Sequence, residues 1–272
     1  MPITLAPVPH QPARRVAWRA AARAFLAGAA LALVGCASPG PTNDDEALTK
    51  ALNTSPWAKA SRLPARSEHT AWRHQGIGNR PVSRYRPAVH QGRPALEGRS
   101  ESGDSLVRLP LTVAGPALGT LRFSWFVNAL NPLSDLADRH LDDAVARVII
   151  QFDGDRSAFS PRDLVLSDML QLATGEPLPY ATLMYVWDHR YPVGTVIPHA
   201  RSARIKTLVI ESGPERLGRW VDFERDVAAD YETAFGKPPL RVNGIALMTD
   251  SNNTRHASTA WYGPLSWASA QP

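Results

Sequence analysis

The chain has 272 residues, with 30 basic and 25 acidic side chains, a formal net charge of +5 and a single cysteine. One thiol excludes an intramolecular disulfide and a cysteine-rich metal site. The charges are interspersed rather than gathered in a basic run, so we expect no nucleic-acid partner. The length is sufficient for one large domain with a hydrophobic core.

The first 35 residues have the pattern of an export signal. Four arginines and no acidic residue accompany an apolar run over residues 24–35, which is too short to cross a bilayer comfortably. The run ends in Leu33-Val34-Gly35-Cys36, which closely resembles the lipobox of bacterial lipoproteins. In those proteins the signal is cut before the cysteine, and the thiol carries a diacylglycerol. The alternative is an ordinary secretory signal with an incidental cysteine.

The lipobox predicts a membrane partner, with Cys36 as the lipidation site. Two or three acyl chains, palmitate among them, are enough for stable anchoring. Because Ala37 rather than aspartate follows the cysteine, the resemblance implies sorting to the outer membrane, on the side that faces the periplasm. Export by the Sec or the Tat route stays open. Without residues 1–35 the chain holds 26 basic and 25 acidic residues, a net charge of +1.

Residues 36–66 follow, with Ser, Pro, Thr and Asn, an acidic triplet at 44–46 and little apolar periodicity. This composition predicts a flexible tether, so we expect the folded domain to occupy residues 67–268. Alternating or continuous apolar runs, separated by Gly and Pro turns, predict strands over 105–113, 118–127, 144–152, 181–188, 203–211, 241–250 and 258–267.

Two helices are also predicted. Ser160-Pro161-Arg162-Asp163 has the capping signals of a helix start. Apolar residues at spacings of three and four from Trp220 to Phe235 indicate the second helix, which ends at Gly236. Many strands with two peripheral helices predict an all-β-dominated fold, a jelly-roll-like β-sandwich.

Five separated motifs then carry a resemblance to a bacterial family, domain of unknown function 3047. They occur in the order LRFSWFV, DDAVARVIIQF, LMYVWD, W…RDVAADYETAFG and GIALMTDSNNT…ASTAWYGPLSW, within residues 70–268. The family brings no established activity. It implies a jelly roll similar to galactose-binding-like and carbohydrate-binding modules, in an exported protein.

Charges that interrupt apolar strands are the first candidate ligand contacts. Arg147 stands inside AVARVII, and Asp250 ends GIALM. A buried charge needs a partner, so we expect Arg147 to lie within ion-pair reach of Asp143, Asp188 or Asp250. Arg147 and its carboxylate partner either face a ligand or form a structural ion pair.

The loop at 250–254 contains Asp and Asn oxygens, and Asn253 is a candidate ligand contact. Such a loop either binds Ca²⁺ near Asp250 or caps its own backbone. The spacing of an EF-hand is absent, and no histidine spacing indicates zinc. We therefore expect no metal or other cofactor, with Ca²⁺ near Asp250 as the open alternative.

Trp125 and Trp187 are candidate stacking platforms for a sugar ring, although their alternating positions are also typical of a core. Gly103-Asp104-Ser105-Leu106 spells the nucleophile block of the GDSL esterases. A strand pattern rather than a helix follows it, and no C-terminal Asp-x-x-His supplies a base. We therefore interpret it as a turn into a strand, and expect His74 to be solvated.

Three functions stay open. The first is a non-catalytic envelope module that binds a glycan or another polar ligand. The second is a hydrolase acting on polysaccharide or ester, and the third is a structural envelope protein without a ligand. A concave face with aromatic side chains and two carboxylates about 5–10 Å apart would favour the hydrolase.

Overall fold

A computed structural model describes residues 43–64, 70–115 and 118–268. The chain divides into two units, Met1–Gly40 and Pro41–Pro272, and the described residues all belong to the second unit. The expected signal peptide and Cys36 lie outside the described residues, so both stay predictions.

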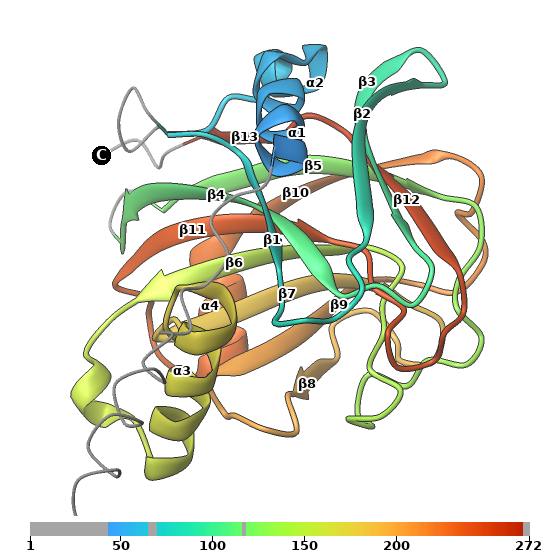
Figure 1. The fold of residues 1–272 in the computed structure, drawn as a ribbon. Coiled ribbons are helices and arrows are strands. Elements are labelled where there is room, and N and C mark those ends of the chain that lie inside the picture. Colours follow the sequence, from blue (N-terminus) through green and yellow to red (C-terminus); the bar gives the residue numbers. More distant parts are fainter. Residues whose placement is uncertain (1–42, 65–69, 116–117, 269–272) are drawn as a thin grey trace, which may run out of the picture. The chain divides into compact units, whose positions relative to one another are not determined.

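Strands of the described residues form two sheets, shown in Figure 1. The seven-stranded sheet contains, in spatial order, β1 (Arg73–Gly76), β4 (Ser105–Ala114), β11 (Arg241–Met248), β6 (Arg147–Asp153), β7 (Ala181–Asp188), β9 (Ile205–Ser212) and β8 (Val196–Pro198). The six-stranded sheet contains β10 (Trp220–Asp226), β5 (Thr120–Val127), β12 (Ser258–Tyr262), β3 (Arg93–Ser100) and β2 (Arg84–His90), with β13 (Ser266–Ala268) also paired to β5. Paired strands are antiparallel except β7 and β9.

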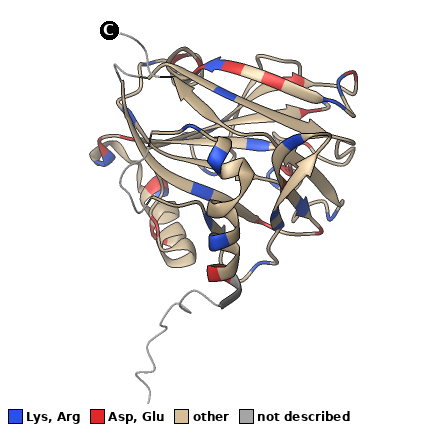
Figure 2. Ribbon diagram, turned by 90° about the horizontal axis from the view of Figure 1, so that it is seen from above, with Lys and Arg blue, Asp and Glu red and all other residues tan. Residues whose placement is uncertain are grey.

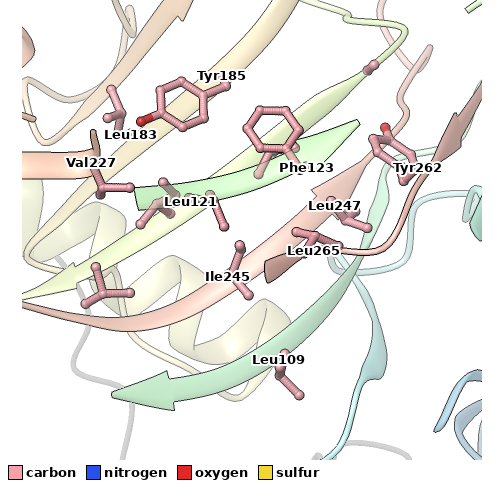
Figure 3. Close-up of a cluster of buried hydrophobic side chains, with 14 of the residues drawn as sticks. Leu109, Leu121, Phe123, Leu183, Tyr185, Val227, Ile245, Leu247, Tyr262 and Leu265 are labelled. Atoms are coloured by element: carbon pink, nitrogen blue, oxygen red, sulfur yellow. The ribbon is translucent and has the colours of Figure 1, made fainter. Parts of the chain in front are cut away.

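The core lies where the inner faces of the two sheets meet, as Figure 3 shows for Phe123 and Leu121 of β5 beside Ile245 of β11 and Tyr185 of β7. On β5, alternate residues from Leu121 to Val127 face this core, as the sequence pattern predicts. The alternating apolar pattern identifies the core-facing residues because successive side chains of a strand point to opposite faces of the sheet. The predicted β-sandwich dominated by β-structure is confirmed.

Helix α3 (Pro161–Thr174) begins where the capping signals predict. The Ser160 side chain accepts from the Asp163 backbone N–H, and the Asp163 carboxylate accepts in return from the Ser160 backbone N–H. The helix ends at Gly175, whose φ of 77° belongs to the left-handed region that glycine adopts without strain. A short 3-10 helix, Arg156–Ala158, precedes it.

The prediction of a second helix is wrong for its first half and right for its second half. Residues Trp220–Asp226 form strand β10, which pairs along β5, and only α4 (Val227–Phe235) is helical. Pairing with β5 satisfies the backbone of this segment from Trp220 onward. Asp226 then caps the first turn by accepting from the N–H groups of Ala228 and Ala229.

The prediction of a flexible tether is wrong for residues 43–64. This segment forms α1 (Asn43–Thr54) and α2 (Pro56–Ala60), and Leu52 and Trp57 are fully buried. The Trp57 indole donates to the Gly263 carbonyl at 2.9 Å, close to the C-terminal strands. Two large apolar side chains therefore bring the segment into the sandwich core. No helix within the described ranges is both long and apolar enough to span a bilayer.

Candidate functional site

The two candidate tryptophans lie in the core. Trp125 is 0% and Trp187 is 2% exposed, and their ring centroids are 6.5 Å apart. The Trp187 indole donates to the Gly213 carbonyl at 3.0 Å. With both rings packed against protein, neither presents a face on which a solvent-borne sugar could stack. Ligand contact by these tryptophans therefore receives no support from the fold.

Arg147 and Asp250 form the expected ion pair. Arg147 Nε donates to Asp250 Oδ1 at 3.1 Å, and Nη2 donates to Oδ2 at 3.3 Å. Arg147 Nη2 also donates to the Asp142 carbonyl, and Nη1 lies 3.6 Å from the Met184 sulfur. The two charged side chains are only 8% and 5% exposed. The pair is a sealed internal contact rather than the wall of an open cleft.

Neighbouring carboxylates tie the chain segments on either side of this pair together. Asp143 is fully buried and accepts from the backbone N–H groups of Asn253 and Thr254, at 3.1 and 2.7 Å. The Asn253 amide donates to Asp142 Oδ1 at 2.5 Å. Through these bonds the segment before β6 holds the loop after β11. Asp142, Asp143, Arg147, Asp250 and Asn253 are together called the Arg147 cluster.

Burial raises the pKa of Asp250 to about 7, against the opposing attraction of Arg147 and with a further rise from the Asp143 charge. Both oxygens of Asp250 accept from nitrogen donors, since Oδ1 also bonds the Ala144 N–H at 3.0 Å. The described ranges hold no group of three or more His, Cys, Asp or Glu side chains arranged for a metal. The geometry gives no support to Ca²⁺ at Asp250.

Asp188 forms no ion pair with Arg147 among the described residues and has a local role. Its Oδ2 accepts from the backbone N–H groups of Arg190 and Tyr191, at 2.8 and 2.5 Å, and so closes the turn after β7. The residue is 3% exposed. Hydrogen bonds and one ion pair therefore link Asp143, Arg147, Asp250 and Asn253 through Asp142, and among the described residues none of these bonds includes Asp188.

The Ser105 hydroxyl has a partner that the sequence does not indicate. Ser105 starts β4, as expected, but His74 Nε2 lies 2.9 Å from its Oγ, and His74 Nδ1 lies 3.8 Å from Asp45 Oδ1. The expectation of a solvated His74 is wrong, because its side chain is 8% exposed. Burial also lowers the pKa of His74, against the influence of Asp45.

The Ser105 hydroxyl of this Ser–His–Asp arrangement is closed to solvent, whereas the Asp45 side chain is 47% exposed. Ser105 is 0% exposed, and its Oγ also accepts from the Ser83 N–H at 2.9 Å. A nucleophile must be reachable by its substrate, and this hydroxyl is enclosed. In the observed conformation the three side chains join α1, β1 and β4 as a polar contact within the fold.

An open site lies elsewhere, between the start of α3 and the end of α4. Its volume is about 560 Å³. We call it the basic pocket, and define it by its charged and aromatic lining, Arg162, Asp163, Arg204, Lys206, Tyr231, Phe235 and Lys237. Four cations and one carboxylate give this lining a net charge of +3.

Three of the four cations of the basic pocket lie over aromatic rings. The Arg204 guanidinium lies 4.7 Å from the Tyr180 ring centroid, the Lys237 ammonium 5.0 Å from the same centroid, and the Lys206 ammonium 5.2 Å from the Phe235 centroid. Ring faces attract cations and restrict their motion. Lys237 also donates to the Tyr180 hydroxyl at 2.5 Å, and this bond lowers the pKa of Tyr180.

Within the described part of the chain, one of the four cations has an acidic partner. Arg204 Nε lies 3.8 Å from Asp163 Oδ2. Burial alone would raise the pKa of Asp163, but hydrogen bonds from Ser202 and Ser160 outweigh it and lower the pKa, so this carboxylate stays ionised. No ion pair within residues 43–64, 70–115 and 118–268 includes Arg162, Lys206 or Lys237.

Sequence reasoning missed the basic pocket because its cations come from three separate segments, around residues 162, 204–206 and 237. Figure 2 shows that both charge signs are interspersed over the fold as a whole. No run of Lys or Arg marks the pocket in the sequence. A weak signal existed in Arg204-Ile205-Lys206, which places two cations at the start of a strand.

These observations define a two-layer β-sandwich with internal polar contacts and one basic surface pocket. A family described as "Protein of unknown function (DUF3047)" matches residues 70–266, and the chain belongs to this family. The resemblance drawn from the five motifs is therefore confirmed. A search of curated proteins finds no match.

Two solved structures match this chain at low TM-scores. One is the xyloglucanase domain of NopAA, a type three effector from Sinorhizobium fredii, in complex with cellobiose. It has a TM-score of 0.41 and 8% identity, over 75% of this chain and 95% of that one. The other is the endo-1,4-beta-glucanase CelB2, a cellulase, with a TM-score of 0.31 and 11% identity, over 78% of this chain and 90% of that one. Both similarities are distant.

Proposed function

We propose that the chain is a lipid-anchored module of the cell envelope that binds an anionic polar ligand, such as an acidic glycan, without transforming it. The observation that carries the proposal is the basic pocket, where three cations that form no ion pair with any described residue line one cavity. Exposed cations normally gain solvation by spreading apart. Their convergence on a concave, partly aromatic surface favours an anion that they can share.

The size and lining of the pocket narrow the ligand class. A volume of about 560 Å³ suits one or two sugar rings or a molecule of similar size. The half-buried Phe235 offers apolar contact, while Arg162, Lys206 and Lys237 offer charge-assisted hydrogen bonds. Carboxylate, phosphate and sulfate groups are the natural acceptors for such donors.

The anchor rests on the lipobox-like segment that ends at Cys36. An acylated Cys36 would hold the domain at the outer membrane, on the side that faces the periplasm. Acidic polysaccharides and phosphorylated glycans are components of bacterial envelopes, so the proposed location and the proposed ligand class agree.

A glycan array tests this binding function. The purified chain is applied to acidic and neutral oligosaccharides of matched length, at low and moderate salt. We expect retention on acidic glycans that weakens as salt rises, because exposed charge contacts are screened. Equal retention on neutral glycans, or retention on none, would contradict an anion-binding pocket. Retention on none would favour the structural envelope protein.

Matched variants assign the binding to the pocket. Arg162→Met with Lys237→Met removes two exposed cations, whereas Lys59→Met with Arg84→Met removes the same charge outside the pocket. Each charge-assisted hydrogen bond contributes about 1.5–3 kcal/mol, so losing one weakens binding about 10- to 100-fold. We expect this loss in the first pair alone. An equal effect of both pairs would indicate non-specific charge attraction.

A second candidate function is ester hydrolysis, favoured by the contact between Ser105 and His74. It requires the segments that cover Ser105 to open, since the hydroxyl is enclosed in the observed conformation. Turnover of a chromogenic acetyl ester by the wild-type chain, together with its loss in Ser105→Ala, would support the hydrolase. Turnover that persists in Ser105→Ala would exclude Ser105 as the nucleophile.

A further inference from the structure

Helix α3 carries an apolar face that points away from the fold. Its outward side chains Leu164, Val165, Met169 and Leu172 are 50%, 60%, 59% and 84% exposed, and we call them the α3 stripe. Nine large hydrophobic side chains are exposed in the described residues, and four of them belong to this one helix. Single exposed apolar residues are ordinary, but four on one face indicate a contact surface.

The opposite face of α3 fixes the orientation of this stripe. Leu166 and Leu170 pack against the main core. The buried Ser167 hydroxyl accepts from the Arg156 guanidinium at 2.5 Å and from the Leu178 N–H at 3.2 Å. Because its inner face is held by packing and hydrogen bonds, the helix cannot roll to hide the stripe without breaking these contacts.

The point where the chain enters the fold lies beside the end of this helix. Asp45, in the first turn of α1, contacts His74 of β1 at 3.8 Å. The next residue, Gln75, donates through its side chain to the carbonyl of Thr174, the last residue of α3, at 3.3 Å. One short strand therefore contacts both the start of α1 and the C-terminal end of α3.

This placement sets the reach of the proposed anchor. Seven residues lead from Cys36 to the start of α1, and an extended chain covers at most about 3.6 Å per residue, or about 25 Å in total. Fourteen helical residues are about 21 Å long at 1.5 Å each. A lipid on Cys36 would thus hold the start of α1 within about 25 Å of the bilayer, and β1 connects this point to the C-terminal end of α3.

We infer that the α3 stripe docks on the phospholipid surface to which the chain is anchored, so that the domain lies on the bilayer in one orientation. The inference rests on the proposed acyl anchor at Cys36. An amphipathic helix that lies in the interface buries its apolar face at the boundary between headgroups and acyl chains. Asp168 lies among the outward residues and limits the depth of insertion, while Arg162 at the helix start suits anionic headgroups.

A labelling experiment tests the docking. In an acylated chain Cys36 is blocked, so Leu172→Cys supplies the one free thiol for a polarity-sensitive dye. Val89→Cys is the matched control, because Val89 is 70% exposed and lies on β2 of the six-stranded sheet. Each labelled chain is reconstituted in vesicles of phosphatidylethanolamine and phosphatidylglycerol that contain a spin-labelled quencher lipid.

We expect quenching at the Leu172→Cys site to be several-fold stronger than at the Val89→Cys site. Adding Val165→Glu and Met169→Glu should remove the difference, whereas Leu240→Glu, at a residue 64% exposed elsewhere, should not. Equal quenching at the two sites would overturn the docking. A dye signal that instead rises with protein concentration in detergent would identify a second copy as the partner and would also overturn it.

The experiment distinguishes a missing lipid anchor from a failure of the α3 stripe to dock. Two dyes per chain would mean that Cys36 carries no lipid, which contradicts the anchor. The docking is then measured on Cys36→Ser with Leu172→Cys, held to nickel-chelating lipids by an N-terminal hexahistidine tag. Strong quenching there would support the docking by itself, and weak quenching would overturn it.

Discussion

Replacing Arg147 by methionine tests whether the Arg147–Asp250 pair is a sealed internal contact. Methionine keeps much of the apolar volume of the arginine stem but removes the charge and the donors to Asp250 and to the Asp142 carbonyl. The Asp250 carboxylate then stays buried without a cation. Breaking a buried pair in this way costs about 3–5 kcal/mol of unfolding free energy.

The loss should depend on pH, with a sign that follows from the pKa of Asp250. Burial raises this pKa to about 7 in the folded state, above its ordinary value of 3.8. A raised folded pKa means that the protonated native form is favoured, and that this stability is lost as pH rises through about 7. Without Arg147 the ionised form is disfavoured further. The variant should therefore lose the full 3–5 kcal/mol near pH 8 and clearly less near pH 6.

Urea unfolding at both pH values, followed by tryptophan fluorescence, measures the loss. Arg86→Met is the control, since Arg86 forms an exposed pair with Glu97 and its removal should leave the midpoint almost unchanged. Combining Arg147→Met with Asp250→Leu should restore much of the stability, because an apolar pair leaves no buried charge. A loss below about 1 kcal/mol for Arg147→Met at pH 8 would refute the reasoning.

Trp57→Ala should lower the unfolding free energy by about 3–5 kcal/mol, because α2 fills the core; a loss as small as that of Lys59→Ala would show that the segment is a tether after all. Ser105→Ala should cost about 1–3 kcal/mol in the same assay, since it leaves the Ser83 N–H without its acceptor, and an unchanged midpoint would count against the enclosed network. Cys36→Ser should abolish palmitate labelling and release the chain from membranes after a carbonate wash. Labelled, membrane-bound Cys36→Ser would contradict the anchor.

The sandwich could be predicted from the sequence because its central strands carry their own patterns. The alternation in β5 and the apolar runs of β6 and β7 follow from burial on one or both faces. Strand β10 could not be separated from α4 in this way. The spacing of its apolar residues suits a helix, and pairing with β5 overrides it.

The candidate site was predictable in one part only. Arg147 inside an apolar strand requires a partner, and that requirement led to Asp250. Two other features depend on contacts between segments far apart in the chain. The Ser105–His74 contact joins residues 31 apart, and the basic pocket gathers cations from Arg162 to Lys237. Local sequence patterns carry no information on contacts between distant segments, so these contacts become visible only in the folded structure.

Calorimetric titration of the purified chain with an acidic oligosaccharide selected on the array tests the central claim most directly. We predict binding of one ligand per chain, with an affinity that falls at least about 10-fold in Arg162→Met with Lys237→Met and is unchanged in Lys59→Met with Arg84→Met. Equal affinities of the wild-type chain and the pocket variant would contradict ligand binding in the basic pocket.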